Sequence, residues 1–103
     1  MKLKDVFKNI EIVNIKGDAD IDITNITSDS RLVKNNCLFF AIKGYSLDGT
    51  KFINSAIENG ANSIVIDDET NLDSVCNNPC ITIIQVKNIR KALALCSCNL
   101  YDN

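Results

Sequence analysis

Hydroxyl-bearing residues gather in two short polar segments, which lie on either side of an apolar run. The first segment is residues 27–31, with the sequence T-S-D-S-R, and the second is residues 44–49, with the sequence G-Y-S-L-D-G. Hydroxyl and backbone N–H groups can hold a phosphate or the edge of a heterocycle. Ser28 and Ser30 are two residues apart, so their side chains would share one face at the end of a strand. Ordinary capping of a strand end is the alternative interpretation.

Other side chains in these segments have two possible uses each. Arg31 can pair with an anion, or with Asp29 or Asp48 of the protein itself. Tyr45 offers a flat surface for a base or a sugar, although it can equally pack as a loop residue on its own domain. Asp48 and Gly49 together are typical of a turn.

The two segments are joined by residues 37–42, C-L-F-F-A-I, which are all apolar and predict a buried strand. Such a strand is a rigid rod with a loop at each end. Ligands of open α/β sheets bind in crevices at the ends of strands. The strand therefore predicts where the two polar segments could form a site.

The rest of the chain shows helix-like and strand-like periodicity. Apolar spacing predicts helices at residues 2–8, at 52–59 with a stop at Gly60, and from an N-cap at Asn88 to Leu100. Alternating or β-branched runs predict strands over residues 10–15, 18–23, 23–27, 63–67 and 80–86. Asn35 and Asn36 predict a turn, and residues 68–79 predict a polar loop. The expected fold is one α/β domain, residues 1–103, with a small mixed, partly parallel sheet flanked by helices.

Composition argues against several classes of partner. The net charge is −2 and no basic run occurs, so nucleic acid and anionic membrane are poor partners. The N-terminus lacks the apolar core of a signal peptide. The longest apolar runs are about six residues, against the ~20 needed to span a bilayer. These features predict a soluble, cytoplasmic protein with no membrane partner.

The usual catalytic side chains are scarce. The chain has no histidine, so it has no imidazole base and no Ser-His-Asp triad. Its four glycines fit neither G-x-x-x-x-G-K-[ST] nor G-x-G-x-x-G. The pair at 67–68, Asp-Asp, could bind a metal or a ribose, but a solvated strand end is the commoner use. The spacing of Asp18, Asp20 and Asp22 resembles the start of an EF-hand loop. The glycine and the final glutamate of such a loop are absent, which favours a solvated strand face. We predict a binding domain with no catalytic residue and no metal site.

Five cysteines occur, namely Cys37, Cys76, Cys80, Cys96 and Cys98. An odd count without an export signal favours free, buried thiols. A zinc site is one alternative, but histidine is absent and Cys96 and Cys98 would point in different directions on a helix. A disulfide is the other alternative.

Two stretches carry a family resemblance. Residues 29–61, D-S-R-L-V-K-N-N-C-L-F-F-A-I-K-G-Y-S-L-D-G-T-K-F-I-N-S-A-I-E-N-G-A, resemble the N-terminal domain of the Mur ligases, cytoplasmic enzymes of peptidoglycan precursor synthesis. The family pattern is D-S-R, a turn, an L-F-x-A strand and then G-x-x-x-D-G-x-x-F-I-x-x-A-x-x-x-G-A. Residues 86–101 resemble the helix that closes this domain, and the two stretches make up about half of the chain. The chain departs from the pattern at 35–37, where Asn-Asn-Cys replaces the usual Pro-Gly-Asp, and at Thr50, where histidine is common.

The resemblance implies a Rossmann-like domain that binds the UDP part of UDP-N-acetylmuramoyl-L-Ala-D-Glu. The family's substrate contacts map onto Ser28, Ser30, Tyr45, Ser46 and Leu47. Arg31, Asp48 and Gly49 are interpreted as scaffold, in a salt link and a turn.

The resemblance also implies what lies outside this chain. The parent enzyme would use ATP and Mg to add lysine or diaminopimelate, through central ATPase and C-terminal domains that are absent here. The fragment itself would need no cofactor and would be inactive alone. One alternative is the family member that adds D-Ala-D-Ala, and another is a free-standing binding module without ligase activity.

Overall fold

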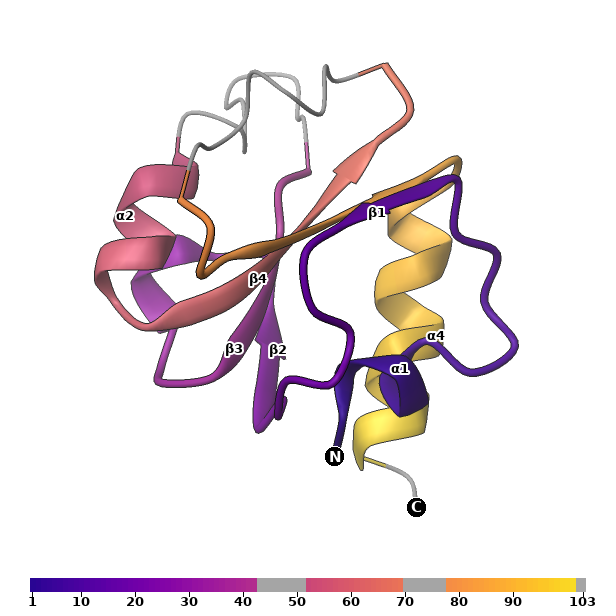
Figure 1. The fold of residues 1–103 in the computed structure, drawn as a ribbon, viewed down its shortest axis with the longest axis horizontal. Helices are drawn as coiled ribbons and strands as arrows, with labels where there is room; N and C mark the ends of the chain where they lie inside the picture. Colours follow the sequence, from indigo (N-terminus) through magenta and orange to yellow (C-terminus); the bar gives the residue numbers. More distant parts are fainter. Residues whose placement is uncertain (43–51, 70–77, 102–103) are drawn as a thin grey trace.

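The fold was analysed in a computed structural model that describes residues 1–42, 52–69 and 78–101 (Figure 1). Within these residues the strands form one five-stranded sheet, in the order β1-β5-β4-β3-β2. Their bounds are β1 Asn14–Lys16, β2 Asn25–Thr27, β3 Cys37–Phe40, β4 Ala61–Asp67 and β5 Thr82–Val86. Strands β2, β3, β4 and β5 pair in parallel, whereas β1 is antiparallel to β5. The predicted mixed, partly parallel sheet is confirmed.

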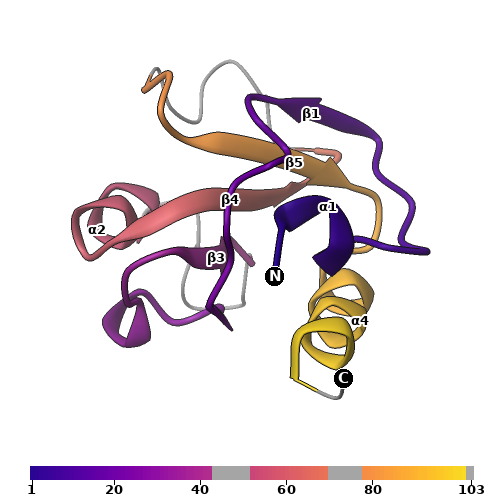
Figure 2. The same ribbon diagram turned by 60° about the horizontal axis from the view of Figure 1, so that its bottom comes forward.

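Helices cover both faces of the sheet (Figure 2). They are α1 Leu3–Val6, α2 Ile53–Glu58, α4 Ile89–Tyr101 and the 3-10 turn η1 Ser30–Leu32. Apolar residues of α1 and α4 pack on one face, and those of α2 pack on the other. Asn88 begins α4, where its Oδ1 accepts a hydrogen bond from the Lys91 N–H at 3.1 Å. The predicted helices and this N-cap are confirmed, and no helix in the described part of the chain is long and apolar enough to cross a membrane.

Strand β3 lies inside the sheet and is buried along its whole length. Phe39 contributes to the core beneath α2, and Phe40 contributes to the core beneath α1 and α4. Both phenylalanines have 0% of their surface exposed. A strand covered on both faces must be apolar at every position, which explains the unbroken run and confirms the predicted buried strand.

The turn before β3 is held by close backbone contacts. Asn36 has φ 61°, in the left-handed region that asparagine tolerates. Its N–H donates to the Gly60 carbonyl at 3.0 Å, and its own carbonyl accepts from the Thr24 N–H at 3.0 Å. The turn predicted at Asn35 and Asn36 is confirmed, and it fixes the starts of β2, β3 and β4 relative to one another.

The strand predicted at residues 10–15 is shifted in the structure. Strand β1 covers Asn14–Lys16, and its three residues are exposed. Asn9 has φ 65°, and the Ile10 N–H donates back to the Phe7 carbonyl at 3.0 Å. The chain therefore turns where extended structure was predicted, while Ile10 still packs against the core on the α4 side of the sheet.

The strand predicted at residues 18–23 is wrong. This segment forms only an isolated bridge, between Lys2 and Asp22, because its backbone pairs with the start of the chain. For example, the Leu3 N–H donates to the Ile21 carbonyl at 2.8 Å. Two carboxylates of the segment form exposed ion pairs, Asp20 with Lys4 at 2.9 Å and Asp22 with Lys2 at 3.2 Å.

Four of the five cysteines lie in the described residues, and all four are free. Cys37 and Cys96 are buried, whereas Cys80 and Cys98 are exposed. Burial raises the pKa of the Cys96 thiol to about 12 and also raises the pKa of Cys37 above its usual value. The prediction of free thiols is confirmed for these four, and the prediction of burial holds for Cys37 and Cys96 only.

Candidate functional site

The candidate site is the edge of the sheet at which the four parallel strands end. Ser28 follows β2, Asp68 follows β4 and Lys87 follows β5, while Ile42 lies two residues beyond β3. The carboxyl ends of parallel strands meet at one edge, and ligands of open α/β sheets bind outside it. The topology therefore brings the segment at 28–31 and the start of the segment after β3 to the same edge.

Ser28 and Ser30 lie at this edge, but not as strand residues. Strand β2 ends at Thr27, and the tight turn η1 begins at Ser30. The alternation of side chains in a strand therefore does not apply, and it gives no ground for placing both hydroxyls on one face. Ser28 is exposed and Ser30 is half-buried.

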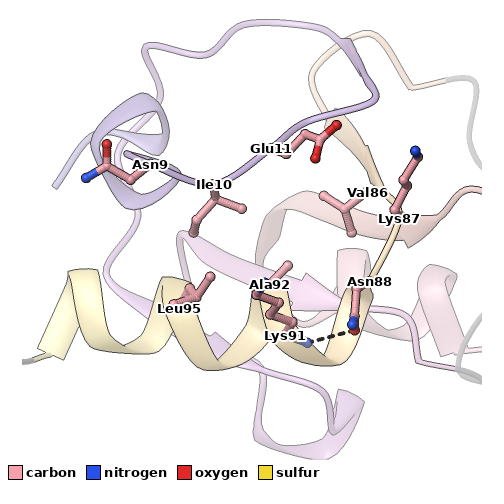
Figure 3. A pocket seen from close by; sticks show the side chains of 9 residues that line it. All are labelled: Asn9, Ile10, Glu11, Val86, Lys87, Asn88, Lys91, Ala92 and Leu95. Carbon is pink, nitrogen blue, oxygen red and sulfur yellow. Dashed lines mark hydrogen bonds between the residues drawn. The ribbon is translucent and has the colours of Figure 1, made fainter.

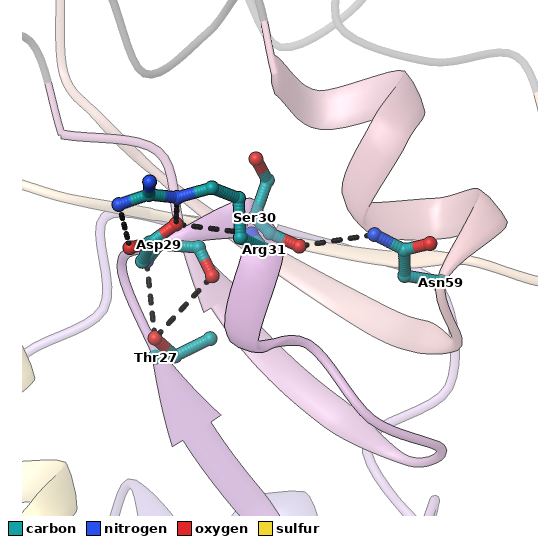
Figure 4. A network of polar contacts seen from close by, with 5 residues as sticks. All are labelled: Thr27, Asp29, Ser30, Arg31 and Asn59. Atoms are coloured by element: carbon teal, nitrogen blue, oxygen red, sulfur yellow. Dashed lines mark hydrogen bonds and ion pairs between the residues drawn. The ribbon is translucent and has the colours of Figure 1, made fainter.

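A network of polar contacts shapes the segment (Figure 4). The Asp29 N–H donates to the Thr27 Oγ1 at 3.0 Å. The Asp29 Oδ1 accepts from the Arg31 N–H at 3.0 Å, which caps η1. The guanidinium of Arg31 donates to the same carboxylate through Nε, at 3.0 Å to Oδ1, and through Nη2, at 2.8 Å to Oδ2. Arg31 is thus engaged with Asp29, which agrees with its interpretation as scaffold.

A second contact links the segment to α2. Asn59 is the C-cap of α2, and its Nδ2 donates to the Ser30 backbone carbonyl at 3.0 Å. The Ser30 hydroxyl points to the side away from Thr27 (Figure 4). In the described part of the chain, neither serine hydroxyl takes part in a hydrogen bond.

The ion pair within this segment leads to a test by pH titration. The side-chain hydrogen bonds from Arg31 lower the pKa of Asp29 below its usual value. Because the folded pKa is the lower one, the pair contributes stability above the unfolded pKa and loses it as the pH falls through the folded pKa. We expect the pKa of Asp29 to rise in Arg31→Ala, measured by carbon NMR of the side-chain carboxyl. The pKa of Asp20, which Lys4 lowers, serves as the control and should not move. An unchanged Asp29 pKa would show that the pair does not form in solution.

The carboxyl edge also carries a hollow of about 370 Å³. It lies beyond the ends of β3, β4 and β5 and is lined by Ile42, Asp67, Asp68, Glu69, Lys87, Asn88, Ile89 and Arg90. Both signs of charge are present, and the Asp67 Oδ1 accepts from the Glu69 N–H at 3.1 Å. Among residues 1–42, 52–69 and 78–101, no three His, Cys, Asp or Glu side chains come together as metal ligands.

A separate hollow of about 370 Å³ lies between residues 9–11, the end of β5 and α4 (Figure 3). Ile10, Val86 and Leu95 line it together with Glu11 and Lys91. It is formed at the side of the sheet that α4 covers, away from β2, so it does not include Ser28 or Ser30.

Three of the predicted contact residues, Tyr45, Ser46 and Leu47, lie outside the described residues, as do Asp48, Gly49 and Thr50.

Two residues that shape the site, Thr27 and Asn59, were not predicted from the sequence to be side-chain hydrogen-bond partners of this segment. Thr27 could have been found, because a hydroxyl two residues before Asp29 is a common local hydrogen-bond partner. Asn59 was predicted only to end a helix, and its contact with Ser30 spans 29 residues of sequence and depends on the tertiary fold.

The chain belongs to the Mur ligase family. Residues 22–100 match the family described as "Mur ligase family, catalytic domain". The resemblance seen at residues 29–61 and 86–101 is therefore confirmed, and the chain has the fold of a Mur ligase N-terminal domain.

Proteins with high sequence identity to this chain agree with the assignment to this family. The chain is 52% identical over all 103 residues to the UDP-N-acetylmuramoyl-L-alanyl-D-glutamate–2,6-diaminopimelate ligase of Clostridium tetani, of which it covers 21%. It is 45% identical over 101 residues, 98% of its length, to ligase 2 of that name in Clostridium acetobutylicum, of which it covers 20%. The chain thus spans about a fifth of the length of these relatives.

The fold is shared with a solved ligase structure. MurF from Acinetobacter baumannii superposes with a TM-score of 0.71 and 20% identity, over 91% of this chain and 19% of that one. At this identity the likeness establishes the fold alone.

Proposed function

We propose that this chain is the UDP-binding N-terminal domain of a ligase that adds diaminopimelate to UDP-N-acetylmuramoyl-L-Ala-D-Glu. The observation that carries the proposal is 52% identity over the whole chain to a ligase of that name. The chain has no catalytic role of its own in this proposal. The parent enzyme would bind ATP and Mg in a central domain, where ATP would supply the phosphoryl group that activates a carboxylate of the substrate for attack by the amine of the incoming amino acid. The enzyme works in the cytoplasm, on a soluble substrate.

The substrate's uracil and diphosphate occupy the carboxyl edge beside β2 and β3. Ser28, Ser30, Tyr45, Ser46 and Leu47 are the proposed contacts, through hydroxyls, backbone N–H groups and the tyrosine ring. The support comes from Ser28 and Ser30, which lie at this edge with hydroxyls unengaged by the described residues. Arg31 is assigned to the loop, because its Nε and Nη2 donate to the Asp29 carboxylate, at 3.0 and 2.8 Å.

The ligase that adds D-Ala-D-Ala is the less well supported alternative. Its structures share this fold at 20–21% identity, a level that does not distinguish one ligase from another. The much higher identity to the diaminopimelate ligases therefore favours the first assignment.

Replacement of Ser30 tests the site in the full-length enzyme. A hydroxyl that binds a charged oxygen contributes about 1.5–3 kcal/mol, so Ser30→Ala should raise KM for the UDP substrate by about 10-fold or more. Because this contact is the same in the ground and transition states, kcat should change little. Ser55→Ala, on the exposed side of α2, is the matched control. An unchanged KM in Ser30→Ala would remove Ser30 from the site.

A further inference from the structure

We infer that Asn59 is a positioning residue for the nucleotide, acting through the segment at 28–31. This inference rests on the function proposed above. Asn59 lies outside the D-S-R segment, 29 residues further along the chain than Ser30. Its Nδ2 donates to the Ser30 carbonyl at 3.0 Å, and so it holds the backbone from which the Ser30 hydroxyl projects (Figure 4).

The anchor at Asn59 is itself well fixed. Its N–H donates to the carbonyls of Ser55 and Ala56, at 3.0 and 3.2 Å, in the last turn of α2. The next residue, Gly60, accepts from the Asn36 N–H at 3.0 Å and leads directly into β4. The side chain of Asn59 therefore extends from a rigid junction of helix and sheet.

The other contacts of the segment are local. Thr27, Asp29 and Arg31 bond to one another within five residues, which shapes the turn without tying it to a neighbouring element. Among the described residues, the backbone at 28–31 is joined to a helix by a side-chain hydrogen bond at one point, where Asn59 of the α2 C-cap donates to the Ser30 carbonyl. A loop already held in its binding conformation loses less entropy when the ligand arrives. Loss of the Asn59 amide should therefore weaken binding while the hydroxyls remain present.

Asn62 offers a matched control. Its Nδ2 also donates to a backbone carbonyl, that of Asp22, at 2.9 Å. Asn62 is the second residue of β4. Asn59→Ala removes the bond to Ser30. Asn62→Ala removes the bond to Asp22 and also the contacts of its amide with the Asn36 Oδ1, at 3.4 Å, and the Ser63 Oγ, at 3.1 Å, none of which involves residues 28–31.

The test is a titration of the 103-residue chain with uridine diphosphate, followed by NMR chemical shifts. We expect Asn59→Ala to weaken the Kd about 3- to 10-fold, as the loss of one preorganising hydrogen bond implies. Asn62→Ala should bind as the wild type does, although it loses more hydrogen bonds and should lower the Tm at least as much as Asn59→Ala does. Without ligand, the carbonyl carbon shift of Ser30 should move in Asn59→Ala and stay unchanged in Asn62→Ala.

The possible outcomes separate the inference from the function it rests on. Equal affinity in the wild type and Asn59→Ala would overturn the inference and leave the proposed function standing. Equal weakening in both variants would also overturn it, because the effect would then follow stability alone. Failure of the wild-type chain to bind uridine diphosphate at residues 28–31 would overturn the proposed function and the inference together.

Discussion

Phe40→Ala is expected to lower the free energy of unfolding by about 3–5 kcal/mol, as for other large-to-small replacements in a core. Phe40 has 0% exposure and packs among side chains of α1, α4 and the central strands. Truncation removes the buried ring and leaves a cavity that the surrounding strands, paired on both sides of β3, cannot collapse to fill. For a domain of this size such a loss is a large part of the total stability.

Urea unfolding followed by circular dichroism measures this loss. Leu32→Ala is the control, because Leu32 is 63% exposed and its removal should change stability by no more than about 0.5 kcal/mol. A loss below about 1 kcal/mol in Phe40→Ala would show that β3 is not the buried centre of the sheet.

Gly60→Ala is expected to cost about 2–4 kcal/mol, from backbone strain together with a steric clash. Gly60 has φ +121°, which residues with a Cβ rarely adopt. A Cβ at this position would lie 2.9 Å from the backbone N and Cα of Asn35. The neighbouring atoms belong to a hydrogen-bonded turn, so they cannot move away as a flexible side chain would.

The same unfolding experiment applies to this variant. Ser55→Ala places the same side chain on the exposed face of α2 and should be nearly neutral or slightly stabilising. A Gly60→Ala protein as stable as the wild type would contradict the close approach of the chain at Gly60 and Asn35.

The parts of the fold that the sequence predicted are those set by local pattern. An apolar run bounded by polar segments was sufficient to predict β3, because a central strand of a covered sheet must be apolar on both faces. Asn88 and Gly60 marked helix ends through chemistry that acts within a few residues.

The failures lie where distant contacts decide the outcome. Residues 18–23 alternate as a strand does, yet their backbone-to-backbone bonds go to residues 1–4. The sheet reaches them through side chains, those of Thr82 and Asn62. Strand β2 ends at Thr27, before the D-S-R segment, so a spacing rule for strands does not apply to Ser28 and Ser30. The contact of Asn59 with Ser30 likewise exists only once α2 is packed beside η1. A family resemblance could assign the serines to the site, but it could not show what holds them.

The most direct test of the proposed function is an amide NMR titration of this chain with UDP-N-acetylmuramoyl-L-Ala-D-Glu. We predict shift changes that cluster at residues 28–31 and 44–49, even where binding is only millimolar. A cluster of changes elsewhere, for example around the hollow lined by Lys91 and Leu95, would contradict the proposed site. The absence of any change at residues 28–31 with millimolar substrate would contradict a preformed UDP site at the carboxyl edge of this sheet.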